Sequence, residues 1–591
     1  MSATQKTSPA AAVAGEVPIL RVKDLTISVK TEQGLHPLVS NLSFVLKKGE
    51  TLAIAGESGS GKSLTALAIM GLLPPPAVRV TQGGIIFEDS NLTRSSESQL
   101  QKLRGNRIAM IFQEPMTALN PVMTLGAQLI EAIRAHKNIS ANAARRRALE
   151  VVRAVRLNDP ERRLSQYPHE LSGGMRQRVV IAMAIALRPN ILIADEPTTA
   201  LDVTVQREIL DLLRELAQEL NTALILITHD MGVVAEMADR VLVMQNGKMI
   251  EQAPVLDLFA APRQAYTKTL LAAVPRMGKG RGRHPNAQAR PLVSFRNACV
   301  AYDLRGGILG RVVQRVHAVE GVSFDIYPGE TFALVGESGC GKSTVARALT
   351  GLVPHTGDIR FLGKPLGDNA EKRKQVSRDL QMVFQDPMAA LNGRMTVGDL
   401  VREPMVIHGI GTTSTRRERS EKLFAKVGLP SNALNRYPHE FSGGQRQRIC
   451  IARALTLNPK MIIADESVSA LDVSVQATVL DLLAELKQEL NMSYLFISHD
   501  MAVVENIADR VAVMYLGQIV EMGTGAQIFG DPQHPYTQRL IEAVPHADPT
   551  RLLPSRVLTT QDPPSPIHPV GSPPTLVRYK NVGDSHLVAC I

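Results

Sequence analysis

Two short segments of this chain carry the residue types that hold phosphate groups. Residues 56–63 read GESGSGKS and residues 336–343 read GESGCGKS, and both fit the pattern of a glycine, four residues, then Gly-Lys-Ser. In such a loop the glycines let backbone N–H groups face phosphate oxygens, the lysine reaches the terminal phosphates, and the serine can bind magnesium. Each match follows an apolar strand pattern and precedes a helical pattern, so we predict two sites for ATP and Mg²⁺.

The residues that we assign to nucleotide binding in these segments belong to the two loops and the helical turn after each. They are Gly56, Ser58, Gly59, Ser60, Gly61, Lys62, Ser63 and Leu64 in the first, and Gly336, Ser338, Gly339, Cys340, Gly341, Lys342, Ser343 and Thr344 in the second. Cys340 stands where the first loop has Ser60, and a tolerated small residue explains it better than a redox role.

An Asp-Glu pair ends an apolar run in each half of the chain. Asp195-Glu196 and Asp465-Glu466 follow stretches that are too short and too rich in branched residues for a helix. A carboxylate at the end of a buried strand needs a partner, so we assign Asp195 and Asp465 to magnesium. We assign Glu196 and Glu466 as the groups that polarise the attacking water.

Four further polar residues recur at matched positions. Gln113 and Gln385 each follow an apolar strand pattern, and His229 and His499 each lie 33 residues after the Glu (196 to 229 and 466 to 499). We expect the glutamines to sense magnesium and the attacking water, and the histidines to contact the γ-phosphate. The predicted metal ligands are Ser63, Gln113 and Asp195 in one site and Ser343, Gln385 and Asp465 in the other.

The segments LSGGMRQR (171–178) and FSGGQRQR (441–448) predict a second phosphate clamp in each half. The serine suits a helix N-cap, and the two glycines leave backbone N–H groups exposed at the positive helix end. Each half then has two clamps for one nucleotide, so we expect each helix end to close on the nucleotide of the other half. In this arrangement Ser172, Gly173 and Gly174 cap the nucleotide at Lys342, and Ser442, Gly443 and Gly444 cap the one at Lys62.

Near-constant spacing between these motifs indicates a duplicated domain. Lys62 and Lys342 are 280 positions apart, while Asp195 and Asp465 are 270 apart. Short apolar runs alternate with helical patterns, which predicts an α/β fold with a parallel sheet and surrounding helices in each half. The predicted strands are 51–56, 191–195 and 223–228 in the first half and 331–336, 461–465 and 493–498 in the second.

Length and composition favour two large globular lobes in a reducing compartment. The chain has 591 residues and a net charge of +10, and its four cysteines lack the spacing of a zinc site or a disulfide framework. Its strongest apolar run, 179–187, is about half of what spans a membrane, and the start of the chain lacks a secretory signal. The basic charge is compatible with RNA or an anionic membrane, but a solvated surface is the simpler interpretation, and we expect no nucleic acid partner.

The predicted domain boundaries follow changes in composition. Segment 546–591 contains proline clusters, so we expect little regular structure there before the final few residues. We divide the chain into a disordered tail (1–16), a first lobe (17–275), a linker (276–291), a second lobe (292–545) and a proline-rich C-terminal tail (546–591).

Taken together, these motifs resemble those of the ATP-binding-cassette family over nearly the whole chain. The resemblance includes the turns 200–202 and 470–472, which both read ALD. It implies two tandem ATPase cassettes, each with an added helical subdomain. The segments QEPMTALNP (113–121), QDPMAALNG (385–393) and QHPYTQRLIEAVP (533–545) are similar to ATPase subunits of peptide importers, and 263–275 is a weaker copy of the last. The fused two-lobe layout is most similar to glutathione importers.

This resemblance implies partners and a location. An importer ATPase docks on two transmembrane permeases at the cytoplasmic face of the bacterial inner membrane, as a peripheral subunit. A periplasmic solute-binding protein feeds the permeases. We expect short permease helices to contact the surfaces after Gln113 and Gln385, including Leu119 and Leu391.

Some residues depart from the family pattern. The family stacks adenine on an aromatic residue upstream of the loop; Tyr302 stands there in the second half, but Val29 in the first. We therefore expect less selective adenine binding at the first site. Ser467 replaces the usual proline after Asp465-Glu466, and with only Cys590 in the tail we predict no metal cluster.

Two alternative functions stay open at this point. A two-cassette ATPase that acts on ribosomes would share the motifs, but it usually has a long charged helical linker, and this linker is short and rich in Gly and Arg. An importer of another small solute, such as nickel chelates, would have the same ATPase residues.

Overall fold

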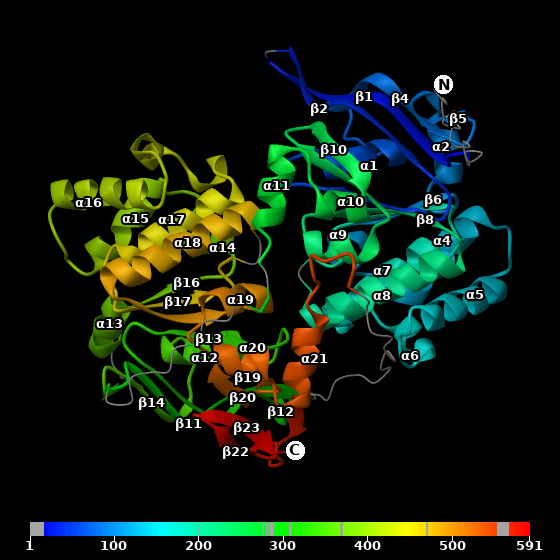
Figure 1. Ribbon diagram of the computed structural model, residues 1–591. Coiled ribbons are helices and arrows are strands. Elements are labelled where there is room, and N and C mark those ends of the chain that lie inside the picture. The colour runs from blue at the N-terminus through cyan, green and yellow to red at the C-terminus, as the bar shows by residue number, and fades with distance from the viewer. Residues whose placement is uncertain are drawn as a thin grey trace, which may run out of the picture. The chain divides into compact units, whose positions relative to one another are not determined.

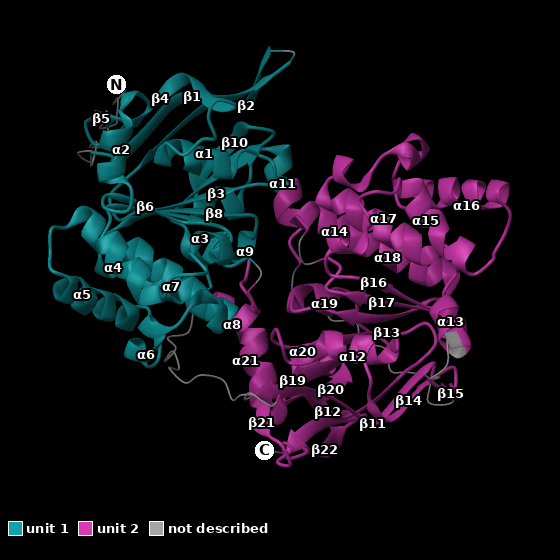
Figure 2. Cartoon of the chain, turned by 180° about the vertical axis from the view of Figure 1, so that it is seen from behind, with its two compact units in different colours: residues 1–199, 209–268, 548–553 teal, residues 200–208, 269–547, 554–591 magenta. Residues whose placement is uncertain are grey.

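The computed structural model describes residues 17–32, 34–199, 201–275, 277–278, 282, 289–306, 310–366, 370–468, 471–551 and 566–590. The expected disordered tail 1–16, most of the expected linker and residues 552–565 lie outside this part. The chain divides into two compact units (Figure 2). Unit 1 comprises residues 1–199, 209–268 and 548–553, and unit 2 comprises 200–208, 269–547 and 554–591.

Unit 1 contains a six-stranded sheet that is parallel except at one edge. Its order is β10-β9-β3-β8-β7-β6, and only β10 runs antiparallel to its neighbour. The strands are β3 (Thr51–Ala55), β6 (Ile108–Ile111), β7 (Ile191–Asp195), β8 (Ala223–Thr228), β9 (Arg240–Gln245) and β10 (Lys248–Pro254). The strands predicted at 51–56, 191–195 and 223–228 are confirmed, because buried β-branched runs bounded by turns favour a central parallel strand.

A second sheet of unit 1 is antiparallel and has the order β2-β1-β4-β5. Its strands are β1 (Leu20–Thr31), β2 (Gly34–Leu46), β4 (Val78–Phe87) and β5 (Ser90–Asn91). Buried side chains from β1, β2, β3 and helix α1 (Lys62–Met70) form one core, so α1 is packed against residues of both sheets (Figure 1).

Between β6 and β7 the chain forms a group of helices that pack on one another (Figure 1). They are α3 (Pro115–Ala118), α4 (Leu125–His136), α5 (Ala141–Ala154), α6 (Pro160–Ser165) and α7 (Gly173–Ile185). This group is the expected helical subdomain. The other helices of this half are α2 (Glu97–Leu103), α8 (Val203–Glu219), α9 (Met231–Met237), α10 (Val255–Ala260) and α11 (Ala265–Ala272).

Unit 2 repeats this architecture with three additional strands. Its larger sheet has the order β16-β17-β18-β13-β19-β20-β23-β22, and its smaller sheet has the order β15-β14-β11-β12-β21. The shared strands are β11 (Val293–Gly306), β12 (Arg311–Ile326), β13 (Thr331–Val335), β14 (Thr356–Phe361), β15 (Lys364–Pro365), β16 (Leu380–Val383), β17 (Met461–Asp465), β18 (Ser493–Ile497), β19 (Arg510–Tyr515) and β20 (Gln518–Thr524). The predicted fold class and the three predicted strands of this half are confirmed.

The helices of unit 2 follow the same sequence order as those of unit 1. They are α12 (Lys342–Leu349), α13 (Ala370–Asp379), α14 (Pro387–Ala390), α15 (Val397–Ile407), α16 (Thr413–Lys426), α17 (Gly443–Leu455), α18 (Val473–Leu490), α19 (Met501–Ile507), α20 (Gly525–Gly530) and α21 (Pro535–Ala543). In the described part of the chain, no helix combines the length and the apolar character that a membrane crossing requires.

The C-terminal segment corrects one sequence-based expectation. Where little regular structure was expected, the segment forms β21 (Ile567–Pro569) and β22 (Arg578–Gly583), whereas β23 (His586–Cys590) lies in the final few residues that the expectation left out. β21 pairs with β12, and β23 pairs with β20, so two sheet edges supply the hydrogen-bonding partners that a proline-rich sequence cannot supply by itself. Ala589 is buried in the core of unit 2.

A second correction concerns the leucines expected to face the permeases. Leu119 and Leu391 are only 3% and 4% exposed, so they belong to the interior of the protein. Met116 and Met388, three positions earlier in each half, are 49% and 51% exposed. Leu119 and Leu391 follow the short helices α3 and α14 in extended backbone, so helical spacing does not place them on the same face as the methionines.

Candidate functional site

Both glycine-rich loops approach a neighbouring strand so closely that only glycine fits at their first position. Gly56 has a φ of +147°, and a Cβ atom built there would lie 2.2 Å from the carbonyl oxygen of Met244. Gly336 has a φ of +145° and the same 2.2 Å clash with Met514. Each loop therefore leaves its strand in a conformation that a side chain would prevent, as a loop wrapped around a phosphate requires.

A buried lysine lies at the centre of each loop. Lys62 Nζ donates to the carbonyl oxygens of Gly56 at 2.7 Å and of Glu57 at 2.8 Å. Lys342 repeats both contacts, at 2.7 and 2.8 Å, in the second loop. Helices α1 and α12 begin at these lysines, and neither has a side-chain N-cap. An ammonium group and an uncapped helix N-terminus together favour an anion at each loop.

Other predicted loop residues differ in exposure. Ser58, Gly59, Ser338 and Gly339 are exposed, whereas Ser60 and Cys340 are buried and Leu64 and Thr344 are half-buried in the first helical turn. Burial raises the pKa of the Cys340 thiol, although Lys342 opposes the shift. The thiol therefore stays protonated and is a poor nucleophile.

Two of the three predicted magnesium ligands meet in each unit, whereas Gln113 and Gln385 donate to Glu196 and Glu466 instead. Ser63 Oγ donates to Asp195 Oδ1 at 3.0 Å, and Ser343 Oγ donates to Asp465 Oδ1 at 2.9 Å. Burial raises the pKa of both aspartates, against the opposing effect of the serine hydrogen bond. A hydroxyl and a carboxylate oxygen this close are donors of the kind that Mg²⁺ prefers, so the residues present fit the ion. Among the described residues, no group of three or more His, Cys, Asp or Glu forms a metal site by itself.

Glu196 is the centre of a polar cluster in unit 1. Gln113 Nε2 donates to its Oε2 at 3.0 Å, Thr199 Oγ1 donates to the same oxygen at 2.8 Å, and His229 Nδ1 lies 3.2 Å from Oε1. Burial by itself would raise the pKa of Glu196, but His229, Thr199 and the charge of Lys62 lower it to about 2. The carboxylate is therefore ionised at physiological pH and can accept a hydrogen bond from water.

Glu466 has a similar environment in unit 2. Gln385 Nε2 donates to its Oε2 at 2.6 Å, and His499 Nδ1 lies 3.5 Å from the same oxygen. Burial opposes ionisation of Glu466, yet the hydrogen bond and the charge of His499 lower its pKa. Burial also disfavours the charged form of His499, but Glu466 reverses this effect and raises the pKa of the histidine.

Backbone strain marks the same two glutamates, and the sequence offered no signal for it. Glu196 and Glu466 both have a φ of +46°, in the left-handed region that residues with side chains seldom adopt. Such a conformation costs on the order of 1–3 kcal/mol and persists where the surroundings enforce it, often at functional sites. Here the backbone N–H of each glutamate donates to the adjacent strand, at 2.9 Å to Ile227 and to Ile497.

The predicted signature segments lie at the starts of α7 and α17. Ser172 Oγ accepts the N–H of Met175 at 3.4 Å, and Ser442 Oγ accepts that of Gln445 at 3.4 Å, which confirms both N-caps. Ser172, Gly173, Ser442 and Gly443 are exposed. These residues do not belong to the hydrogen-bonded groups around Glu196 and Glu466.

Strand register gives each half a ring-bearing residue at matching positions, but on different strands. Tyr302 on β11 is exposed and lies opposite Val316 of β12. The equivalent pair in unit 1 is Val29 of β1 and His36 of β2, so the aromatic residue comes from the partner strand. Residues that pair directly across an antiparallel ladder point to the same face. Aligning the two halves by sequence compares Val29 with Tyr302 and does not point to His36. His36 is found only when the pairing of β1 with β2 is known.

A strand-loop-helix that cradles phosphate, an oxygen pair suited to Mg²⁺ and a Gln–Glu–His group, all present twice, define a P-loop nucleoside triphosphatase with two sites. Residues 39–199 and 319–469 match the ABC transporter family, and residues 250–300 and 520–569 match the C-terminal region of oligopeptide/dipeptide transporters. The chain belongs to the ABC transporter family and is one of its ATPases.

Curated relatives cover almost the whole chain. The glutathione import ATP-binding protein GsiA of Salmonella paratyphi A is 51% identical over 97% of this chain and 96% of its own. GsiA of Pectobacterium atrosepticum is 48% identical over 97% of both chains. Among solved structures, a dimeric bacterial ABC transporter cassette is 29% identical over 40% of this chain and 98% of its own, with a TM-score of 0.36.

The cluster around each glutamate leads to a first prediction. Glu196→Gln and Glu466→Gln keep the shape of the side chain but remove the charge, so ATP turnover in the double variant should fall by about a hundredfold or more. ATP binding, measured by equilibrium dialysis, should persist. Lys62→Ala with Lys342→Ala is the contrasting variant, because it should abolish binding itself. Turnover within threefold of the unmodified protein would exclude these glutamates from the chemistry.

Strand register leads to a second prediction. His36→Ala should weaken ATP binding at the first site about two- to twelvefold, since a stacking contact of this kind contributes about 0.5–1.5 kcal/mol. Lys342→Ala in the same chain limits the measurement to the first site. The matched control is Leu35→Ala, which changes an exposed neighbour on the opposite face of the strand. Equal effects of the two changes would show that the His36 ring has no specific role.

Proposed function

We propose that this chain is the ATP-hydrolysing subunit of a membrane importer of glutathione or short peptides. The observation that carries the proposal is a complete Gln–Glu–His group beside each phosphate loop, in a chain about half identical to GsiA over nearly its full length. In this proposal the chain docks on two permeases at the cytoplasmic face of the inner membrane, and a periplasmic binding protein delivers the solute to them.

Each site has residues suited to one step of hydrolysis. Mg²⁺, when bound, neutralises charge that develops on the phosphates during transfer. Ser63 and Asp195 supply oxygen ligands for it, and Lys62 together with the loop amides orients the phosphates. Glu196 accepts a hydrogen bond from the attacking water. Gln113 and His229 hold the Glu196 carboxylate in place, and in this proposal Gln113 also senses Mg²⁺ and the attacking water while His229 contacts the γ-phosphate when ATP is bound. Gln385, Glu466 and His499 have the corresponding roles at the second site.

We further propose that each signature helix completes the site of the other cassette when ATP is bound. Its support is the exposed start of α7 and of α17, where the glycines leave backbone N–H groups at a positive helix end. ATP bound between two such surfaces would join the cassettes, and hydrolysis would release them. This closing and opening of the cassettes is the movement that would be transmitted to the permeases.

Cysteine cross-linking tests this closure. A chain with Ser58→Cys and Ser442→Cys, in a background of Glu196→Gln and Glu466→Gln, should form an intramolecular disulfide more readily with ATP than without it. Both serines are exposed, and exposed Cys590 is replaced by serine. The control pairs Ser58→Cys with Ser172→Cys in the same cassette and should not cross-link. Cross-links that form only between separate chains would contradict the intramolecular arrangement.

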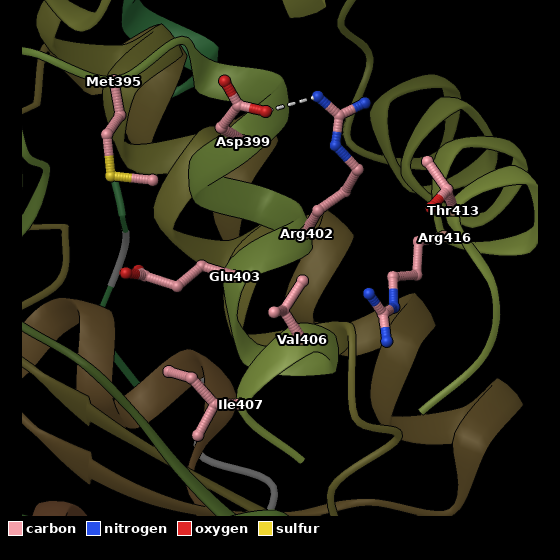
Figure 3. A pocket seen from close by; sticks show the side chains of 8 residues that line it. All are labelled: Met395, Asp399, Arg402, Glu403, Val406, Ile407, Thr413 and Arg416. Atoms are coloured by element: carbon pink, nitrogen blue, oxygen red, sulfur yellow. Dashed lines mark hydrogen bonds and ion pairs between the residues drawn. The ribbon is translucent and has the colours of Figure 1, made fainter. Parts of the chain in front are cut away.

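Exposed apolar side chains suggest where permease helices dock. Phe112 and Met116 flank Gln113, and Phe384 and Met388 flank Gln385, and all four are 38–51% exposed. In unit 2, α15 and the start of α16 also border a cavity of about 520 Å³ (Figure 3). Its lining combines apolar Val406 and Ile407 with the ion pair of Asp399 and Arg402 at 2.7 Å. Such a mixed surface suits an amphipathic helix.

The decisive measurement is uptake of labelled glutathione and of di- to pentapeptides by a strain that lacks this protein. The unmodified chain should restore uptake of at least one of them, and Met116→Glu with Met388→Glu should restore little, because charged side chains would prevent an apolar helix from docking. ATPase activity of the purified variant should stay within about twofold, since neither methionine contacts the Gln–Glu–His groups.

Two outcomes separate the alternatives. Restored uptake of a nickel chelate but not of any peptide would favour the importer of another solute. If uptake does not respond to the protein and the chain is recovered on ribosomes instead of membranes, the importer proposal fails. Leu119→Glu serves as a control for folding, since a buried charge should lower the melting temperature whereas Met116→Glu should not.

A further inference from the structure

A tyrosine from the C-terminal part of each cassette contacts the phosphate loop. The N–H of Glu57 donates to the hydroxyl of Tyr266 at 3.3 Å, and the N–H of Glu337 donates to that of Tyr536 at 3.0 Å. Both tyrosines belong to the repeated segments 263–275 and 533–545, for which the hydrolysis chemistry gives no role. Each hydroxyl fixes the orientation of the peptide group directly after the first loop glycine.

A buried carboxylate holds the start of each tyrosine-bearing helix. In unit 1, Glu251 accepts the N–H groups of Arg263 at 2.8 Å and Gln264 at 3.1 Å, just before α11. In unit 2, Glu521 accepts the N–H groups of Gln533 at 2.8 Å and His534 at 3.0 Å, just before α21. The carboxylate, the helix start and the tyrosine thus form a relay to the phosphate loop in both units.

Among the described residues, unit 2 alone extends this relay with a third partner from the C-terminal segment. His586 Nε2 lies 2.8 Å from Glu521 Oε1, and the two side chains are 6% and 0% exposed. The backbone pairing of β23 with β20 places Val588 opposite Glu521 and Leu587 opposite Met522. In unit 1 the corresponding strand β10 is the edge of its sheet, so no strand in that position carries a histidine.

The tyrosine of unit 2 is also held more firmly. The Tyr515 and Tyr536 rings are 4.3 Å apart between centroids, and the Arg539 guanidinium lies 5.4 Å from the Tyr536 centroid. The equivalent positions in unit 1, 270 residues earlier, are Gln245 and Thr269. Cation–π and ring contacts restrict rotation of Tyr536, in agreement with its shorter hydrogen bond to the loop.

The C-terminal segment has independent anchors on unit 2. Tyr579 OH donates to the carbonyl oxygen of Ile519 at 2.7 Å, and Gln518 Nε2 donates to that of Thr575 at 3.0 Å. β21 places Ile567 opposite Val316, the residue that pairs with Tyr302 on the other side. The segment therefore contacts both the strand that precedes α20 and the β11–β12 hairpin that carries Tyr302.

We propose that residues 566–590 are a built-in positioning element of the second phosphate loop, acting from His586 through Glu521 to Tyr536. ATP affinity at the second site then depends on this segment, and affinity at the first site does not. The inference rests on the proposed function only in taking both loops as ATP sites. His586 and Tyr536 are positioning residues, because they act on the loop backbone and not on the nucleotide.

The experiment compares one change at two sites in the full-length chain. Equilibrium ATP binding is measured in a Lys62→Ala background, which reports the second site, and in a Lys342→Ala background, which reports the first. His586→Ala should weaken binding about three- to tenfold at the second site, as expected for the loss of one hydrogen bond, and leave the first site unchanged. His586→Gln, which keeps an N–H donor, should restore most of the affinity.

Tyrosine variants test the relay at its other end. Tyr536→Phe should weaken only the second site and Tyr266→Phe only the first. Tyr579→Phe is the matched control, because it removes an anchor of the same segment without touching Glu521, and ATP affinity should stay within about twofold. If His586→Ala does not fold, His586→Leu, which keeps a bulky side chain but removes the N–H donor, makes the same test.

Three results would overturn the inference. They are equal loss at both sites, no loss in a His586→Ala protein with an unchanged melting temperature, and no rescue by His586→Gln. Failure of the proposed function gives a different result, in which the unmodified second site binds no ATP in the Lys62→Ala background. That result would overturn both proposals. Normal ATP binding at the second site that does not change in the His586 variants would overturn only this one.

Discussion

The site depends on the parallel arrangement of four neighbouring strands. β3, β8, β7 and β6 lie side by side in that order and run in the same direction, so their carboxyl ends meet at one edge of the sheet. The phosphate loop leaves β3, His229 follows β8, Asp195 ends β7 and Gln113 follows β6. Groups far apart in the chain are therefore brought within hydrogen-bonding distance of one another. The second unit obtains the same result from β13, β18, β17 and β16.

The sequence identified those residues because each has a local reason for its place. A glycine-rich turn, a carboxylate after a buried run and a serine before a helix can all be interpreted without tertiary structure. What the sequence could not supply depends on register and burial. His36 is identified only when β1 and β2 are paired, and Leu119 is recognised as interior only when the helices after Gln113 are packed. The left-handed backbone of Glu196 has no sequence signal, because nothing in the residue type demands it.

The C-terminal strands show a further limit of sequence patterns. Proline clusters argue against regular structure when a segment is considered alone, but an unpaired sheet edge changes the energetics. β12 and β20 offer backbone groups that β21 and β23 satisfy, and the apolar side chain of Ala589 becomes buried. The expectation of little regular structure was based on composition alone, and it took no account of the sheet edges with which the segment pairs.

The two halves also differ in how they protect the strand at the end of the main sheet. β10 has the sequence KMIEQAP, with an exposed Lys248 and a terminal proline, both of which discourage another chain from pairing with it. β20 has the sequence QIVEMGT, is buried along its whole length, and pairs with β23 at Glu521 and Met522. β20 has neither an exposed lysine nor a terminal proline, and β23 occupies the edge that such residues would otherwise protect. A chain cut before β23 by proteolysis or incomplete synthesis would present an apolar, unguarded strand. Self-association of such fragments, more than the loss of any single contact, is the hazard that β23 prevents.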